Sequence, residues 1–580
     1  MFVNTLLICF LATCTLGHRH YLNKSALSAT TAPNVQSGAP DKTAQTGPLT
    51  VSTSGSFRGS WMETRRGRRF QAYRGIRYAE PPVGELRFQP PVPILHYKKE
   101  VDASKEGPAC PLPVPPTYYI DEDCLTINVY TPINKPSNCT KPLPVIFFIH
   151  AGGFYSMTGR SDLAGPHYLL DRDIVLVTIN YRIASLGFLS TGDALAPGNN
   201  GFKDQVVALR WVQRNIRAFG GDPNLVTITG CSAGSFSVML HMISPMSKGL
   251  FHRGISMSGS PVSQSTVEHD LYPLAVKQAE LVGCPTNNSK VIIDCLKTKP
   301  FREIGDSLPG FFDPLFSYTL WRPVVERDFG QERFLTMDPS DAIRQGKMHP
   351  VPHIISQTHD EFFWSAIPIV KNDTLRKTLD AEWEVYAPIN FQLPKDKYAV
   401  ASGNRLREAY LGNEPLANDK KTLDGLGKLY ADAFIGFGVH KMANLMCRYS
   451  PYKVYYYQLA YIGNHSFYED PTTKKPIGAA HHDDLIYLFT LSYQFPTINV
   501  SDSTDSLIVD RMTAIWYNFA RFGDPNPRGN ELPELSTLQW PAMTPTARKY
   551  LKFDRQFTVE ENMFEDRFNV WEELYPIEKH

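Results

Sequence analysis

Short, mostly apolar runs recur through the middle of the chain, and each is about as long as one buried strand. A run without regular polar alternation is typical of a strand that is covered on both faces. Residues 123–130 instead alternate in polarity, which predicts a strand. The mostly apolar runs are Val145 to Ile149, Ile174 to Ile179, Leu225 to Thr229, Val351 to Ile355 and Val454 to Tyr461.

Helical spacing of apolar residues separates these runs. One predicted helix lies between Asp204 and Ala218, another covers residues 235–243, and a third has an apolar stripe from Leu507 to Phe519 and stops at Gly523. Strands that alternate with helices imply right-handed crossovers and a mainly parallel sheet. The sequence thus predicts an α/β fold with a large, twisted, mostly parallel sheet flanked by helices. Mixed patterns over residues 306–329 and 375–426 predict insertions above the strand ends.

The N-terminus has the pattern of a secretory signal peptide over residues 1–17. Its apolar stretch, residues 6–12, is too short to span a bilayer and precedes small and polar residues. Residues 18–48 are rich in Ser, Thr, Ala, Gly and Pro and predict a flexible leader, so we expect one domain over residues 49–576. No later segment is apolar for the length of a membrane helix, and we therefore expect a secreted, extracellular protein without a membrane anchor.

Charge and cysteine content narrow the function further. The net charge of +1 and the absence of a basic run argue against a nucleic-acid partner and favour a neutral small-molecule ligand. Nine cysteines, minus Cys9 and Cys14 in the signal, leave seven, so at least one thiol is expected to stay unpaired. Six glycosylation sequons agree with secretion and predict a glycoprotein: Asn23, Asn138, Asn287, Asn372, Asn464 and Asn499.

The segment Gly230-Cys231-Ser232-Ala233-Gly234 joins a predicted strand to a predicted helix. Glycines two places on either side of a serine permit a sharp turn that lifts the hydroxyl clear of the sheet, an arrangement called a nucleophile elbow. Ser232 is therefore the candidate nucleophile.

A serine nucleophile needs a base, and the base needs an acid that orients it. His481 and His482 lie in a loop late in the chain, and Glu361 and Asp360 follow the strand that begins at Val351. The order Ser, acid, His fits these positions, but position alone does not choose within either pair. The Gly-rich turn after Val145 to Ile149 offers the NH groups of Gly152 and Gly153 to an oxyanion, and the NH of Ala233 is a further donor.

The chain resembles the type-B carboxylesterases from about Leu49 to Pro576. The resemblance implies an α/β-hydrolase fold, a catalytic triad of Ser232, Glu361 and His481, and disulfides that pair Cys110 with Cys124 and Cys284 with Cys295. Cys139, Cys231 and Cys447 are then left as free thiols. The matching stretches are Tyr78 to Phe88, Glu122 to Pro132, His150 to Phe154, Asn180 to Ser190, Gly198 to Val238 and Gly478 to Phe489.

Three positions depart from this family's pattern. Ala151 replaces a usual glycine in the oxyanion loop, and its methyl group is expected to narrow the site. Phe362 follows Glu361 where glycine is usual, which predicts another path for the acid-bearing loop. The Cys110 to Cys124 loop lacks the Trp that cholinesterases use to bind a quaternary ammonium group, which argues against a cholinesterase.

These features predict a secreted serine hydrolase that cleaves carboxylic esters of small molecules through an acyl-enzyme, without metal or cofactor. One alternative is a non-catalytic binding or adhesion protein, because the family includes members that lost the serine. Another is an esterase dedicated to one hormone or pheromone. We rank this alternative lower, because the resemblance suggests Gln, not Cys, before the serine in juvenile-hormone esterases.

Overall fold

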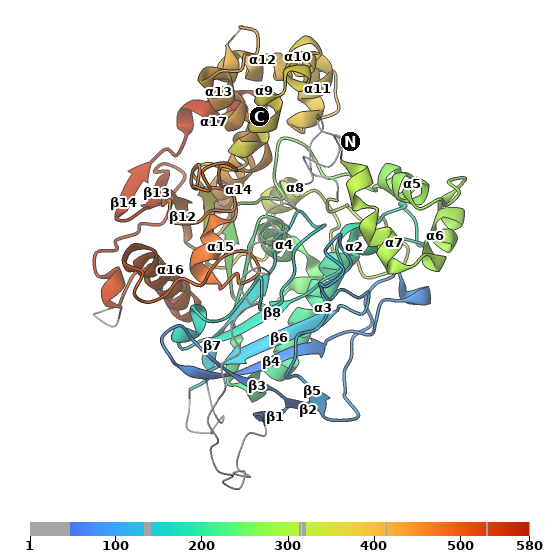
Figure 1. Cartoon of the computed structure of the whole chain (residues 1–580), viewed down its shortest axis with the longest axis vertical. Helices are drawn as coiled ribbons and strands as arrows, with labels where there is room; N and C mark the ends of the chain where they lie inside the picture. The colour runs from blue at the N-terminus through green and yellow to red at the C-terminus, as the bar shows by residue number, and fades with distance from the viewer. Residues whose placement is uncertain are drawn as a thin grey trace, which may run out of the picture.

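The computed structural model describes residues 47–132, 141–312, 315, 321–412, 414–528 and 532–578. An 11-stranded sheet crosses the molecule in the order β14-β13-β12-β11-β10-β9-β7-β8-β6-β4-β3 (Figure 1). Its strands are β3 (Ser60–Glu63), β4 (Arg69–Arg77), β6 (Thr126–Thr131), β7 (Leu143–Ile149), β8 (Val175–Ile179), β9 (Gly221–Cys231), β10 (Arg253–Met257), β11 (His353–Thr358), β12 (Val454–Leu459), β13 (Lys549–Phe553) and β14 (Phe557–Glu561).

The centre of this sheet is parallel and its margins are antiparallel. In spatial order, β8, β7, β9, β10, β11, β12 and β13 pair in parallel. Antiparallel pairing joins β3, β4, β6 and β8 on one side, and β13 and β14 on the other. The prediction of a mostly parallel α/β sheet is confirmed.

Both faces of the central strands are buried, as the apolar runs predicted. In β7, Val145, Phe147 and Ile149 pack in one apolar cluster, whereas Ile146 and Phe148 belong to another on the opposite face. The first cluster includes residues of α3 (Asn200–Asn215), α4 (Ala233–Ile243) and α14 (Phe437–Tyr449), and the second includes residues of α15 (Asp483–Leu488) and α16 (Ser503–Phe522). Because helices cover each face, successive residues of a strand are apolar without alternation.

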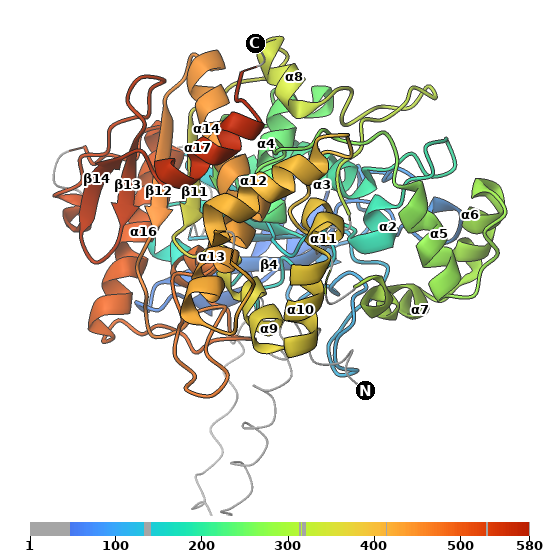
Figure 2. The same ribbon diagram turned by 90° about the horizontal axis from the view of Figure 1, so that it is seen from above.

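Two helical groups lie outside these layers. Helices α9 to α13 pack around a cluster of their own with α17 and gather at one end of the molecule, at the top of Figure 1. Helices α5 and α6 form a smaller cluster with α2, and Figure 2 shows α5 to α7 on the side away from β13 and β14. These helices are α2 (Ala184–Phe188), α5 (Tyr272–Leu281), α6 (Ser289–Thr298), α7 (Phe301–Asp306), α9 (Ala366–Lys371), α10 (Asp373–Ala381), α11 (Trp383–Asn390), α12 (Ala399–Leu411), α13 (Lys420–Ala431) and α17 (Glu565–Leu574), and α8 (Pro339–Arg344) packs beside α4 and α14.

The segment predicted as an insertion at 375–426 therefore folds as helices. Part of the other predicted insertion, residues 306–329, lies outside the described residues. A small second sheet near the start of the described chain joins β1 (Leu49–Val51), β2 (Ser56–Arg58) and β5 (Val101–Asp102).

The structure contains the two disulfides that the resemblance implied, Cys110–Cys124 and Cys284–Cys295. Cys231, which is buried, and Cys447, which is half-buried, carry free thiols. The expected signal peptide, most of the leader, Asn23, Asn138 and Cys139 lie outside the described residues. In the part of the chain that the structure covers, no helix is both long and apolar enough to cross a membrane.

Candidate active site

Ser232 occupies a strained turn between β9 and α4. Its φ of 54° and ψ of −119° lie outside the usual regions for a residue with a side chain. A Cβ on Gly230 would come within 2.4 Å of the backbone of Gly234, and one on Gly234 would come within 2.1 Å of the carbonyl oxygen of Ile149. Only glycine fits at either position, and the elbow predicted from the sequence is present.

The carboxyl ends of three neighbouring strands bring the candidate acid beside the elbow. Cys231 and Met257, the last residues of β9 and β10, are in register with Ser356 near the end of β11. The NH of Ser232 donates to the Met257 carbonyl at 2.8 Å, which ties the nucleophile turn to β10. Glu361 lies three residues after β11 ends at Thr358, and its Oε1 accepts the NH of Thr358 at 2.8 Å.

The structure joins Glu361 to His481. The Nδ1 of His481 lies 2.5 Å from Oε2 of Glu361, and both side chains are buried. Among the described residues, Nε2 of His481 finds no hydrogen-bond partner. A histidine held at Nδ1 with an unused Nε2 is arranged to take a proton from a hydroxyl.

The two rival residues have other partners. Asp360 accepts the NH of Ala479 at 3.0 Å through Oδ2, so it fastens the loop that carries His481. His482 has a left-handed backbone with φ of 79°, and its ring packs edge-on against Phe467. The geometry therefore pairs Glu361 with His481, which sequence position alone left open.

Burial sets the protonation of this pair. It lowers the pKa of His481, because an imidazolium there would lose its hydration, and it raises the pKa of Glu361 above the ordinary range for a carboxyl. The hydroxyl of Ser258 and the NH of Thr358 oppose the rise at Glu361. The low histidine pKa keeps His481 neutral, which is the form that accepts a proton.

The Gly-rich turn after β7 is fixed by its own contacts. Gly152 has φ of 105° and Gly153 has φ of 58°, and the Gly152 carbonyl accepts the NH groups of Tyr155 and Ser156 at 2.9 Å each. The ring of His150 stacks on Tyr181 with centroids 4.2 Å apart, and the Tyr181 hydroxyl donates to the His150 carbonyl at 3.0 Å. The Gly152 carbonyl is thus satisfied within the turn.

Ala151 packs in the apolar core beside this turn. Its side chain is 1% exposed and lies in the same apolar cluster as Phe148 and Cys231. The expectation that its methyl group narrows the site stays a prediction.

A buried polar layer under the histidine loop was not anticipated from the sequence. Asp483 accepts the NH of Ala480 at 2.8 Å and the Ser466 hydroxyl at 2.8 Å, which holds the loop before His481. Asp484 accepts the hydroxyl of Tyr457, and burial raises the pKa of Asp484 to about 7. The available signal was an acidic pair in the first turn of a short apolar helix, where the helix dipole favours negative charge.

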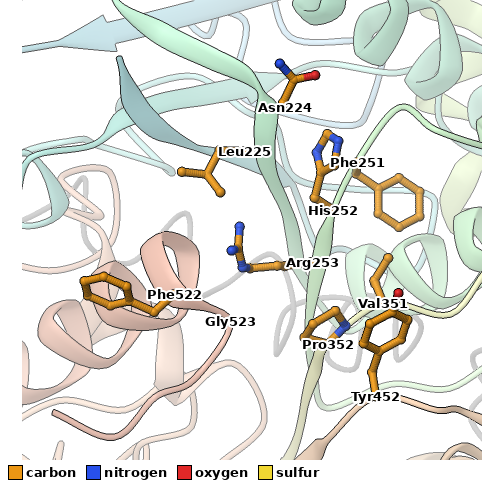
Figure 3. A pocket seen from close by; sticks show the side chains of 10 residues that line it. All are labelled: Asn224, Leu225, Phe251, His252, Arg253, Val351, Pro352, Tyr452, Phe522 and Gly523. Atoms are coloured by element: carbon orange, nitrogen blue, oxygen red, sulfur yellow. The ribbon is translucent and has the colours of Figure 1, made fainter. Parts of the chain in front are cut away.

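A hollow of about 370 Å³ lies at the other end of the same strands. It is lined by the amino-terminal parts of β9 and β10 and by the end of α16, with Leu225, Arg253 and Phe522 among its residues (Figure 3). Ser232 follows the opposite end of β9, so this hollow is separate from the candidate active site.

Comparison with known proteins matches the carboxylesterase family model to residues 46–571. The chain belongs to the carboxylesterase family. It is 34% identical to a carboxylic ester hydrolase of Bombus ignitus, with 87% of this chain and 89% of that protein covered. It is 37% identical to esterase FE4 of Myzus persicae (83% and 85% covered) and 35% identical to juvenile hormone esterase of Tribolium castaneum (83% and 85% covered).

A solved structure extends this likeness to the fold. Juvenile hormone esterase from Manduca sexta, with OTFP covalently attached, superposes with a TM-score of 0.78 at 26% identity and covers 91% of this chain and 99% of its own. The fold is accordingly that of an α/β-hydrolase. Together these matches identify this carboxylesterase as a carboxylic ester hydrolase.

Proposed function

We propose that this carboxylesterase hydrolyses esters through an acyl-enzyme formed on Ser232, with His481 as general base and Glu361 as its orienting acid. The observation that supports this most strongly is the buried 2.5 Å contact between His481 and Glu361 next to a serine elbow. Glu361 holds the imidazole in the tautomer that carries its proton on Nδ1, so Nε2 is free to accept.

In the first half of the reaction, Nε2 of His481 takes the hydroxyl proton of Ser232 while Oγ bonds to the ester carbonyl carbon. The carbonyl oxygen becomes an oxyanion, for which the NH groups of Gly152, Gly153 and Ala233 are the proposed donors. Ala233 is the first residue of α4, so the positive end of that helix adds to the stabilisation. The carbon–oxygen bond to the alcohol then breaks, and Nε2 returns the proton to the alcohol oxygen.

In the second half, water repeats the attack. Nε2 takes a proton from water, hydroxide oxygen bonds to the acyl carbon, and the bond to Oγ breaks as Ser232 recovers its proton. The products are a carboxylic acid and the free enzyme. The relative from Manduca sexta with OTFP covalently attached supports a covalent route.

We further propose that the protein is a secreted glycoprotein. Two disulfides in the chain support an oxidising compartment. The four sequons within the described residues, Asn287, Asn372, Asn464 and Asn499, are exposed and thus accessible to glycosylation.

The identities do not favour a dedicated hormone esterase. The relatives named carboxylic ester hydrolase, esterase FE4 and juvenile hormone esterase are 34%, 37% and 35% identical, so the chain is about equally similar to each. We propose activity on several carboxylic esters, and a p-nitrophenyl ester series from acetate to decanoate tests its breadth.

Replacement of Ser232 by Ala tests the mechanism. We expect kcat/KM for p-nitrophenyl esters to fall by roughly four to six powers of ten, because the nucleophile is lost while the fold is kept. An organophosphate should label Ser232 in the unchanged protein and fail to label the variant. Ser235→Ala is the matched control, since Ser235 lies in the first turn of α4, just after Ser232, and its hydroxyl donates to the Gly259 carbonyl at 2.7 Å. Full activity in Ser232→Ala would refute the proposal.

A further inference from the structure

Phe362 combines a strained backbone with a contact to the catalytic histidine. Its φ of 33° and ψ of 14° place it in the left-handed region, which disfavours a bulky side chain. Its ring centroid lies 4.4 Å from that of His481, at an interplanar angle of 41°. The residue directly after Glu361 therefore packs on the histidine that Glu361 orients.

An aromatic stack holds this ring in place. Phe362 stacks on Trp364 with centroids 5.1 Å apart, and Trp364 stacks on Tyr468 at 5.2 Å. Phe434 meets Phe362 edge-on at 5.3 Å. Tyr468 adjoins Phe467, whose NH donates to Asp483 at 2.8 Å, so the stack links the acid-bearing loop to the segment that supports His481.

The contact between Phe362 and His481 restrains a motion of the imidazole that the Glu361 hydrogen bond leaves open. One hydrogen bond at Nδ1 leaves the imidazole free to tilt about that bond, which would move Nε2 away from the serine. The rings of Phe362 and His482 pack against the imidazole, with centroids 4.4 Å and 4.1 Å from its own, and they restrict that tilt. They also cover the imidazole, which is completely buried.

We propose that Phe362 is a positioning residue for ester hydrolysis, which fixes the plane of the His481 ring and shields it from water. This inference rests on the function proposed above. Backbone strain of about 1 kcal/mol or more persists where the surrounding structure requires a particular side chain. Glycine at position 362 would adopt the same backbone without strain. The contacts of the aromatic ring therefore explain why a strained phenylalanine occupies this position.

The stability of Phe362→Gly distinguishes a positioning role of Phe362 from a purely structural one. Phe362 is only half-buried, and its replacement by glycine exchanges lost packing for relieved backbone strain. If Phe362 positions His481, the free energy of unfolding should therefore change little. If instead Phe362 served only the core, activity and stability would fall together.

The decisive variant is Phe362→Gly, compared with Phe362→Tyr and with Phe363→Leu as a matched control. Phe363 is the adjacent phenylalanine, and it packs against Gly427, where an added Cβ would lie 2.4 Å from its ring. For Phe362→Gly we expect kcat to fall about tenfold, with KM changed by less than about threefold and the melting temperature nearly unchanged. Phe362→Tyr should restore kcat, because it keeps the flat ring.

The pH profile separates positioning from packing. Because kcat/KM requires neutral His481, activity is lost as pH falls through the pKa of His481. Burial lowers that pKa, so access of water in Phe362→Gly should raise it and move the acidic limb to higher pH by about half a unit or more. Phe363→Leu should lower the melting temperature and leave the limb in place.

Unchanged kcat and an unmoved limb in a folded Phe362→Gly would overturn the inference, and so would a loss of activity in step with stability. If Phe362→Gly fails to fold, kcat and the acidic limb of Phe362→Leu test the inference in the same way. The Ser232→Ala measurement separates the two proposals. Full activity there refutes the function itself, whereas an inactive Ser232→Ala with an unaffected Phe362→Gly refutes only the role of Phe362.

Discussion

Asp360 and Glu361 are adjacent in the chain but have different roles, because their side chains point toward different neighbours after the end of β11. Glu361 is buried against His481, whereas Asp360 is partly exposed and accepts the NH of Ala479. A carboxylate that holds the base ring contributes to the transition state, but one that accepts a peptide NH contributes to loop order.

At this scale we predict that Glu361→Gln and Asp360→Asn differ sharply. Glu361→Gln should lower kcat by about two to four powers of ten, since an amide no longer stabilises the imidazolium and can favour the wrong tautomer. Asp360→Asn should stay within about tenfold, because an amide oxygen can still accept the Ala479 NH. Steady-state kinetics on one p-nitrophenyl ester measure both. Comparable losses in the two variants would contradict the assignment of the acid.

The elements around the site are shaped by close backbone approach. Helix α4 begins against β7, and the absence of a Cβ at Gly234 lets the helix reach the Ile149 carbonyl. Strand β6 shows a second tertiary effect: its polar residues are buried, because Asn128 donates to the Gly159 carbonyl and accepts the NH of Gly75. Its alternating sequence thus predicted a strand, but not a strand buried on both faces.

Gly234→Ala should destabilise the fold by about 3 kcal/mol, because the 2.1 Å approach is to backbone and neither partner can turn away. Gly403→Ala in α12 is the control. The nearest atoms to an added Cβ there all belong to side chains, with Ala387 at 3.2 Å and Trp383 and Leu393 at 3.8 and 3.9 Å, so we expect a change within about 1 kcal/mol. Chemical denaturation of both variants measures the difference, and equal stabilities would refute the argument.

At the scale of the whole molecule, disulfide pairing and burial together account for the state of the cysteines that the structure describes. Cys110–Cys124 and Cys284–Cys295 close short loops, with sequence separations of 14 and 11. Cys231 is buried under the elbow, where burial and the nearby carboxylates of Asp484 and Glu361 raise its pKa. Burial also raises the pKa of Cys447, to about 12, so neither thiol forms a thiolate near neutral pH.

We predict that an alkylating reagent at pH 7 leaves Cys231 and Cys447 unmodified in the folded protein. After denaturation without reductant, both should be modified, while the four disulfide cysteines react only after reduction. We also expect Cys139, which lies outside the described residues, to carry a free thiol. Peptide mapping by mass spectrometry locates each label, and a peptide that joins Cys139 to one of the four disulfide cysteines would contradict this assignment.

The local sequence determined the features that depend on near neighbours in the chain. Apolar runs predicted the central strands, because a strand covered on both faces has few places for polar side chains. Gly230 and Gly234 around Ser232 predicted the elbow, since the required backbone is nearly closed to other residues. The helix that ends at Gly523 was also predictable, and Gly523 takes the left-handed conformation that terminates it, with φ of 70°.

Tertiary structure decided what depends on residues far apart in the chain. The contact between Glu361 and His481 spans 120 residues, and no local pattern encodes which of the neighbouring carboxylates turns toward His481. The burial of the Ala151 methyl group in the core and the packing of Phe362 on His481 likewise appear only when separate strands and loops meet. Sequence periodicity records which face of an element is covered, whereas the partner that covers it is set by the packing of the whole chain.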